Sequence, residues 1–536
     1  MKFREQRVSN FLVALCVAVV SCVSFFGLGD FARAASSWYP KKSCRDVWHG
    51  KDLAKYQPDN DAVFSAAGNT GYASTYLKRL AKAGVDRKSC FKEWTVLVYM
   101  AGDNNLSPYA LWDLDEMEGR FESSRSAGST LKTDLVVQLD TEGPTGVRRL
   151  HVFQREDIPY IAGTSVDDYR SRTPHQISSP IIRLFSETGI SKLDSDQGAR
   201  LQNFLEWGVR EYPAEHYMVV VWGHGQGWTA EADPRTGKFG GIMGDPEKGD
   251  SLSIPALRDA LAKTVRDSLD GRPIDVYASD ACLMQMSEVA YEIAPSARFI
   301  AGSAQVQTFV GLPYRRVMYE LNTGRFLSVA GSVGKDDEPL LMAKMLPLLV
   351  EQSLDPIHGQ QGRAEPLARK TFTMSTLSSE TLRVELAPAM LQVSRSLRDY
   401  VKEDFFRAAD LAQAMKNAPS FMGGGKELGS FISLVETSRT DEIAKTAMAT
   451  MISRKLGAAL NNARTALDHT IVEHRFGTQY QDANHPYHLL GYRGLGVWVP
   501  SNAREFKERA SDFALSSFEA DTEWPSWLKP ALGVSP

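Results

Sequence analysis

The sequence predicts an α/β protein in which a mostly parallel sheet carries helices on both faces. Between residue 93 and about residue 330, apolar runs of strand length alternate with amphipathic runs of helix length, as in parallel sheets with crossover helices. The strand-like runs, such as Trp94–Met100, are apolar throughout, which is typical of strands covered on both faces. We therefore expect a core at 93–330 and a mainly helical region at 331–536, with a late strand near 495–500.

The elements of the core can be placed one after another along the chain. The first strand ends at the turn cluster Gly102-Asp103-Asn104-Asn105, which can also cap the helix that follows. Helices are recognised by apolar residues that recur every three or four positions. We expect strands at 94–100, 133–139, 148–154, 217–222, 273–279 and 298–304, and helices at 196–210, 253–265 and 283–293.

Two segments of the last third have a clear pattern. Apolar residues from Leu382 to Val401 step by three or four positions, which indicates a helix that Pro388 either kinks or begins. The run GYRGLGVWVP at 491–500 reads as a buried strand, and we expect it to complete the first sheet from far away in the sequence.

The N-terminus predicts export. A basic start is followed by an apolar run and by Ala32-Arg33-Ala34, a small-x-small cleavage signal, so residues 1–34 are expected to be a secretory signal peptide. Two alternatives remain: a lipoprotein anchored through Cys22, or an uncleaved membrane anchor. All three give a periplasmic, cell-surface or secreted protein. Residues 35–92 are polar and read as an N-terminal extension or pro-segment, and no later run in the mature chain is long enough to span a membrane.

Charge and cysteine usage narrow the function further. The formal net charge of −4 gives no electrostatic reason to expect a nucleic-acid partner. Of five cysteines, two lie in the signal sequence. Export favours a disulfide between Cys44 and Cys90, with two unpaired thiols as the alternative. Cys282 is then left without a partner, and a lone thiol in an exported protein is expected to be either buried or used.

Two expected strands end in reactive side chains. One runs into Trp222-Gly223-His224-Gly225 and the other into Ser279-Asp280-Ala281-Cys282. Because functional groups of parallel sheets gather beyond the carboxyl ends of the strands, the imidazole and the thiol can meet at one edge. A nearby imidazole, or the start of the expected helix at 283–293, would favour the thiolate. The backbone amides of Gly225 and Cys282 are candidate donors to an oxyanion. Either residue alone would more often be a packing or surface residue.

The same segments resemble the clostripain family of cysteine peptidases, relatives of the caspases. WTVLVYMAGDNNLSPYAL is similar to the opening strand of that family, VVVWGHGQGW to its histidine motif and SDACLMQMSEVAYEI to its cysteine motif. GSAQVQTFVGLPY takes the place of its pocket loop, and FTMSTLSSETLRVELAPAM and GLGVWVP are like later segments. The resemblance spans roughly residues 93–500. It implies a caspase-like α/β/α sandwich in which Cys282 is the nucleophile and His224 the general base or acid, with a polypeptide as substrate and a thioester acyl-enzyme as intermediate.

The resemblance leaves the preference of the site open. The family prefers arginine or lysine before the cut and uses acidic pocket residues, one of which Asp280 matches. The expected pocket comprises Asp280, Ser303 and Val310, but Val310 stands where the family has an aspartate. A buried cation without its carboxylate is costly, so a smaller or more apolar preference is the rival hypothesis.

Activation and cofactors are less well indicated. Family members often cut themselves, and the polar loop at 229–250 offers Arg235, Lys238 and Lys248 as candidate sites. Some relatives require calcium, but no EF-hand spacing occurs here, so we expect neither a metal site nor a cofactor. The oligomeric state is not indicated. The alternatives to an endopeptidase are a catalytically inactive caspase-like binding or surface protein, and an amidase or transpeptidase that acts on a cell-wall peptide.

Overall fold

The structure is a computed structural model of the chain. It describes residues 42–44, 90–119, 127–130, 132–142, 146–154, 177, 179, 181–185, 196–228, 241–245, 250–308, 311–329, 337–354, 366–403, 405–421, 425–438, 447–478, 493–514 and 516–534. The predicted signal peptide at 1–34 and most of the predicted extension at 35–92 lie outside the described residues. Among the helices that can be described, none combines the length and the apolar character needed to cross a membrane.

The centre of the fold is a nine-stranded sheet with the order β12-β10-β9-β8-β5-β1-β2-β3-β4. The five strands from β9 to β2 run parallel to one another, and two antiparallel strands extend the sheet at each edge. The strands are β1 (Lys92–Gly102), β2 (Thr133–Thr141), β3 (Val147–His151), β4 (Ile181–Phe185), β5 (Ala214–Trp222), β8 (Ile274–Asp280), β9 (Ala297–Gly302), β10 (Thr373–Ser378) and β12 (Ile471–Phe476).

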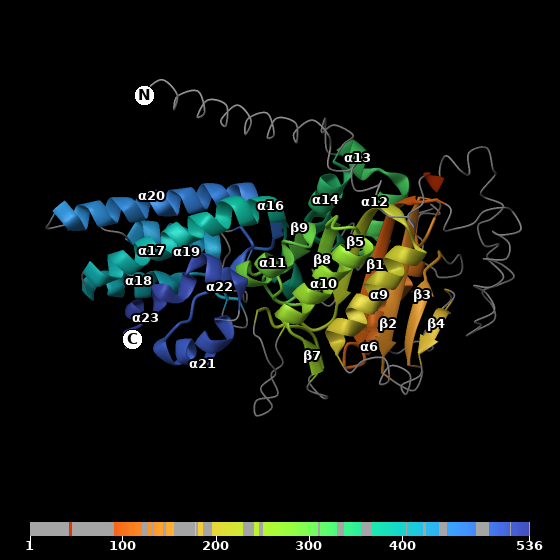
Figure 1. Ribbon diagram of the computed structural model, residues 1–536, viewed down its shortest axis with the longest axis horizontal. Coiled ribbons are helices and arrows are strands. Elements are labelled where there is room, and N and C mark those ends of the chain that lie inside the picture. The colour runs from red at the N-terminus through yellow and green to blue at the C-terminus, as the bar shows by residue number, and fades with distance from the viewer. Residues whose placement is uncertain are drawn as a thin grey trace, which may run out of the picture.

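Helices cover both faces of this sheet, because successive residues of each central strand point to opposite sides. On β1, Leu97 and Tyr99 pack with α9 (Gln197–Glu211), α10 (Ile254–Ser268) and α11 (Ser287–Ile293). Val96 and Val98 pack on the other face with α6 (Ser107–Glu118), α12 (Tyr314–Thr323) and α14 (Glu338–Ser353). Figure 1 shows α9 and α10 crossing in front of the strands. This is the α/β/α sandwich that the sequence predicts.

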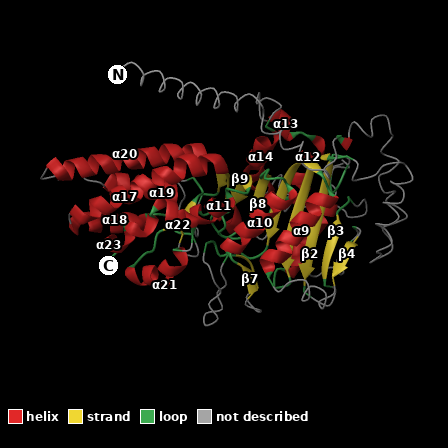
Figure 2. Cartoon of the chain, in the orientation of Figure 1, coloured by secondary structure: helices red, strands yellow, loops and turns green. Residues whose placement is uncertain are grey.

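The last third supplies mostly helices, and those from α17 to α23 gather at one end of the molecule beyond α11 (Figures 1 and 2). The apolar stripe that begins at Leu382 is buried, and Pro388 lies in the first turn of α17, directly after a π-helical turn at Leu382–Leu386. The remaining helices are α13 (Phe326–Val329), α15 (Pro366–Thr371), α16 (Ser379–Thr381), α17 (Ala387–Glu403), α18 (Phe405–Asn417), α19 (Leu428–Ser438), α20 (Ala447–Thr470), α21 (Ala503–Phe513), α22 (Ser517–Thr522), α23 (Leu528–Ala531) and a 3₁₀ turn at Trp524–Ser526.

The expectation for the late strand is wrong in one respect. β13 (Gly496–Trp498) does form, but it pairs with β11 (Gly425–Glu427) in a separate two-stranded sheet. The edge of the main sheet next to β9 is occupied by β10, and β10 is covered in turn by β12. The main sheet therefore takes two strands from beyond residue 330, where the sequence suggested a boundary.

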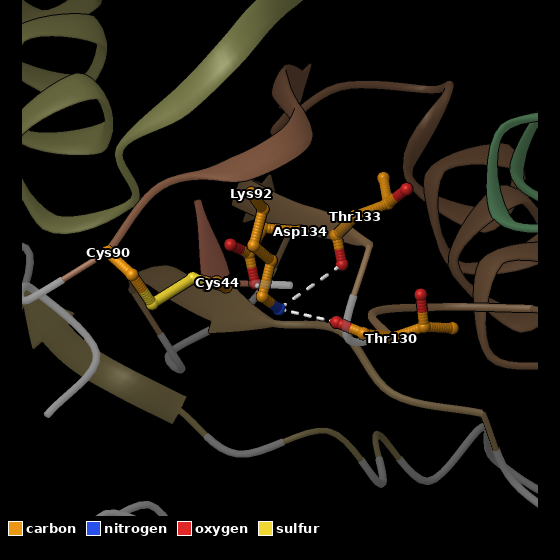
Figure 3. Close-up of a disulfide and its surroundings, with 6 residues drawn as sticks. All are labelled: Cys44, Cys90, Lys92, Thr130, Thr133 and Asp134. Atoms are coloured by element: carbon orange, nitrogen blue, oxygen red, sulfur yellow. Dashed lines mark hydrogen bonds and ion pairs between the residues drawn. A yellow bond between two sulfur atoms is a disulfide. The ribbon is translucent and has the colours of Figure 1, made fainter. Parts of the chain in front are cut away.

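The first strand is fixed at its start by a disulfide and a buried charge cluster (Figure 3). Cys44 and Cys90 are joined, the pairing that the sequence favours. Beside them Lys92 Nζ lies 2.8 Å from Asp134 Oδ1, which also lies 2.8 Å from His151 Nε2. All three side chains are almost fully buried, so each charge depends on its neighbours for compensation.

Candidate active site

The two motifs predicted to be reactive lie side by side at the carboxyl edge of the sheet. β5 and β8 are neighbours, and Trp222 and Asp280 are register partners at their ends. The Gly223 amide then donates to the Asp280 carbonyl over 3.2 Å. His224 and Cys282 each stand two residues beyond that register pair. Adjacent strands are spaced by about 5 Å, so the two residues leave the sheet together.

The glycines around His224 allow this close approach. Gly223 has a φ of +151°, a backbone conformation that side chains disfavour. A β-carbon on Gly225 would lie 2.1 Å from the carbonyl oxygen of Cys282. The His224 loop is also held from its other side by a small hairpin of β6 (Ile242–Asp245) and β7 (Asp250–Leu252), whose Met243 amide donates to the His224 carbonyl. Any side chain at Gly225 would therefore push the histidine and cysteine loops apart.

The thiol of Cys282 is half-buried and already has a hydrogen-bond donor. The amide of Gln307 donates to Cys282 Sγ over 3.3 Å. The segment after the cysteine is bonded to the same loop, since Leu283 N donates to the Gln305 carbonyl. Burial raises the pKa of the Cys282 thiol, the Gln307 amide lowers it, and the charge of Asp280 raises it. The resting thiol is therefore protonated at neutral pH.

The expected helix at 283–293 is wrong at its start. Helix α11 begins at Ser287, and Leu283 has a φ of +61°. The residues between the cysteine and the helix are held in an irregular turn by bonds to the segment at 303–305. Cys282 therefore does not lie at a helix N-terminus, and the helix dipole does not supply the thiolate stabilisation that the sequence suggested.

A distant segment of the chain supports both loops. The Gly496 amide donates to the Gln285 carbonyl, and the Ser287 hydroxyl donates to the Gly496 carbonyl. Trp228, at the end of the histidine motif, packs on Trp498 with ring centroids 5.1 Å apart. The position of the site thus depends on residues more than 200 positions further along the chain.

His224 has a polar partner that the sequence analysis did not identify. His224 Nε2 lies 2.7 Å from Oδ1 of Asn105, an exposed residue in the turn after β1. The sequence analysis treated this turn only as a helix cap. A cluster of polar residues directly after a buried parallel strand was the signal that could have indicated a site residue.

Of the three expected pocket residues, Asp280 and Ser303 are buried, and Val310 lies outside the described residues. Asp280 is only 4% exposed, and its Oδ2 accepts hydrogen bonds from the Leu312 amide at 3.0 Å and the Tyr314 hydroxyl at 2.8 Å. Burial raises its pKa to about 6, and these bonds oppose the rise. Ser303 is fully buried and bonds to the backbone of Gln305. Val310 lies outside the described residues, as do Arg235, Lys238 and Lys248.

Apolar side chains surround the cysteine instead. Leu283, Ala304 and Phe421 form a small buried cluster, against which Cys282 and Phe476 pack. Val306, which precedes the amide donor to the thiol, is 40% exposed. Within the described ranges, no group of three or more histidine, cysteine or acidic side chains could hold a metal ion.

The sandwich, with its motifs at the carboxyl ends of adjacent parallel strands, is the fold of the caspase-like cysteine peptidases. Residues 98–336 match the model of the clostripain family. Clostripain from Hathewaya histolytica is 23% identical over 275 residues, which are 49% of this chain and 46% of the relative. The chain thus spans about half the length of that curated relative.

Solved structures of C11 cysteine proteases have the same fold. A secreted C11 cysteine protease from Bacteroides thetaiotaomicron, solved with an irreversible peptide inhibitor, has a TM-score of 0.51 at 18% identity and covers 81% of this chain and 100% of its own. An inactive zymogen C11 protease from Parabacteroides distasonis has a TM-score of 0.51 at 16% identity, with coverage of 81% and 98%. At these sequence identities, the structural similarity shows the fold alone.

Proposed function

We propose that the protein is an exported cysteine endopeptidase with Cys282 as nucleophile and His224 as general base and acid. The observation that carries the proposal is the register of β5 and β8, which brings both residues off the sheet side by side. The match of residues 98–336 to the clostripain family model supports the same chemistry.

The environment of the thiol defines the steps. Because burial keeps the Cys282 thiol protonated, His224 must accept its proton as the sulfur attacks the scissile carbonyl carbon. The amides of Gly225 and Cys282 are the candidate donors to the oxyanion. The carbon–nitrogen bond then breaks, the amine leaves with the proton from the imidazolium, and a thioester remains. Water, deprotonated by His224, hydrolyses the thioester and restores the thiol.

Loss of either residue should abolish hydrolysis. We expect Cys282→Ala and His224→Ala to lower kcat/KM on an unfolded protein such as denatured casein by at least about 10⁴-fold, since members of a catalytic unit fail together. His469→Ala changes an exposed histidine bonded to Glu385 and is the matched control. In native protein from which residues 1–34 have been removed, iodoacetamide should label Cys282 alone, because Cys44 and Cys90 are bonded to each other. A Cys282→Ala protein as active as the wild type would refute the assignment, and an inactive, unlabelled wild type would favour the binding-protein alternative.

We further propose that the site prefers an apolar side chain before the cut. Asp280 is buried, and the Leu312 amide and the Tyr314 hydroxyl share its Oδ2, while Gln307 Nε2 lies 3.4 Å from Oδ1. A guanidinium or ammonium group would have to displace these donors to pair with it. Val306, which precedes the amide donor to the thiol and is 40% exposed, offers apolar surface that favours burial of an aliphatic or aromatic side chain.

A fluorogenic peptide panel that varies only the residue before the cut tests this preference. We expect leucine, methionine or phenylalanine to give a kcat/KM at least about tenfold above that of arginine or lysine, which corresponds to about 1.4 kcal/mol. Equal or better cleavage after basic residues would overturn the apolar preference and leave the dyad untouched.

Export and self-cleavage stay predictions of the sequence. The residues concerned, 1–34 and 229–250, lie largely outside the described residues. An apolar preference would move any self-cleavage away from Arg235, Lys238 and Lys248. Intact mass measured on wild type and on Cys282→Ala after secretion from the same host would locate both cuts.

A further inference from the structure

Three neighbouring strands each lead into a loop that holds a residue of the site. β8, β5 and β1 are adjacent in the sheet, and Trp222 is the register partner of both Asp280 and Met100. Beyond this common row the strands lead to Cys282, His224 and Asn105 respectively. Figure 1 shows the three strands side by side in the centre of the sheet. His224 thus follows the middle strand of the three, with Cys282 after the strand on one side and Asn105 after the strand on the other.

We propose that Asn105 is a positioning residue that fixes the orientation and the tautomer of His224; the inference rests on the proposed function. Asn105 Oδ1 lies 2.7 Å from His224 Nε2. A carboxamide oxygen can only accept a hydrogen bond, so Nε2 must carry the proton. The lone pair is then on Nδ1, and Nδ1 is the nitrogen that takes the proton of Cys282. Loss of Asn105 removes this restraint on the ring and on its tautomer, so a smaller part of the population is ready to act as base.

The turn that presents Asn105 is held rigid by its neighbour. Asn104 is 4% exposed, its Oδ1 accepts from the Leu106 amide at 2.8 Å, and its Nδ2 donates to the Ala101 carbonyl at 3.3 Å. The Asn104 carbonyl accepts from the Ser107 amide, which begins α6. The two consecutive asparagines therefore have different roles: Asn104 stabilises the turn, and the Asn105 side chain contacts His224.

A structural role for Asn105 would not explain this arrangement. Asn105 is exposed, and a single hydrogen bond between exposed side chains adds little to stability. Its loss should therefore leave the fold intact and affect the reaction. The carboxamide is neutral, so it orients the ring without favouring the imidazolium as a carboxylate would.

Two substitutions separate positioning from charge. We expect Asn105→Ala to lower kcat about 10- to 100-fold with little change in KM, as misplacement of a catalytic group does. Asn105→Asp keeps the acceptor and adds a negative charge, which favours the protonated imidazole. The base form then appears only at higher pH, so the acidic limb of the kcat/KM profile should move upward by about one pH unit or more.

The controls keep the outcomes distinct. Asn417→Ala alters an exposed asparagine on α18 that accepts from Gln413 and should change neither the rate nor the profile. Thermal unfolding of each variant shows whether it is folded, and the Asn105→Asp profile keeps the test decisive if Asn105→Ala is unstable. If Cys282→Ala is inactive while both Asn105 variants keep the wild-type kcat and pH profile, the positioning role is overturned. If Cys282→Ala is active, the proposed function itself has failed.

Discussion

At the scale of single residues, buried carboxyl groups near the nucleophile are a recurrent feature. Asp280 precedes Cys282 in the chain and Glu288 follows it. Burial raises the pKa of Asp280 to about 6 and that of Glu288 to about 7. Asp113 is bonded to the indole of Trp222, and burial, with the charge of Asp280 next, raises its pKa as well. These buried carboxyl groups therefore release their protons at a higher pH than exposed acidic residues do.

Glu288 gives a testable consequence. Its Oε1 accepts from the Trp498 amide at 2.7 Å, while Oε2 has no partner among the described residues. The pKa of Glu288 in the folded protein, about 7, lies above the ordinary value of 4.5. The folded protein therefore loses stability as the pH rises from about 4.5 to 7, and this carboxyl group causes no further loss above pH 7. Glu288→Gln keeps the acceptor and removes the ionisation. We compare the free energy of unfolding of the variant with that of the wild type at each pH. The difference, variant minus wild type, should be about 3 kcal/mol larger at pH 8 than at pH 4.5.

Urea unfolding at the two pH values measures this difference. Glu380→Gln, at an exposed glutamate in the first turn of α16, is the matched control and should show no such change. A Glu288→Gln advantage that is equal at both pH values would contradict the ionisation argument.

The residues of the site differ in how far the sequence could predict them. His224 and Cys282 follow from residue type and from their place after buried strands. Asp280 is expected in the pocket because it matches an acidic pocket residue of the family that the sequence resembles. Its donors Leu312 and Tyr314 lie more than 30 positions away, and the sequence does not tell which carboxylates such contacts occupy. Asn105 was missed because its turn also satisfies the pattern of a helix cap.

At the scale of elements, the central parallel strands were predictable and the sheet edges were not. β1, β2, β5 and β8 are buried along most of their length, and each contains an apolar run of three or more residues. β10, with the sequence TMSTLS, is buried although its sequence is mixed in polarity, and the edge strand β12, with IVEHRF, is mixed in polarity and only half-buried. The start of α11 was misplaced because LMQMSEVAYEI fits a helix throughout, whereas bonds to residues 303, 305 and 496 keep its first residues out of the helix.

At the scale of the whole molecule, the last third is part of the peptidase fold. β10 and β12 complete the main sheet, and the buried cluster on one of its faces continues from α9–α11 into α17–α23. Trp498, Trp524 and Trp527 belong to that cluster and are almost fully buried. The helical region therefore cannot be removed without opening the core.

A chain that ends at residue 330 tests this. It would lack α14, β10 and β12, would expose the edge of β9, and would leave large apolar surfaces uncovered. We expect aggregation, or a collapsed state without a cooperative thermal transition, as seen by circular dichroism and size-exclusion chromatography. The full chain carrying Cys282→Ala, which cannot cut itself by the proposed route, is the reference. A monomeric truncated chain with a cooperative transition near that of the reference would show that residues 93–330 fold independently.

The bond between Cys44 and Cys90 has a consequence for any maturation of the N-terminal part. Hydrolysis at a position between 45 and 89 yields two polypeptides that stay covalently attached. On a gel without reductant the nicked protein would migrate as one species, and the smaller fragment would separate only after thiol treatment. An oxidising environment would thus retain the leading piece against β1, whereas a reducing one would let it diffuse away.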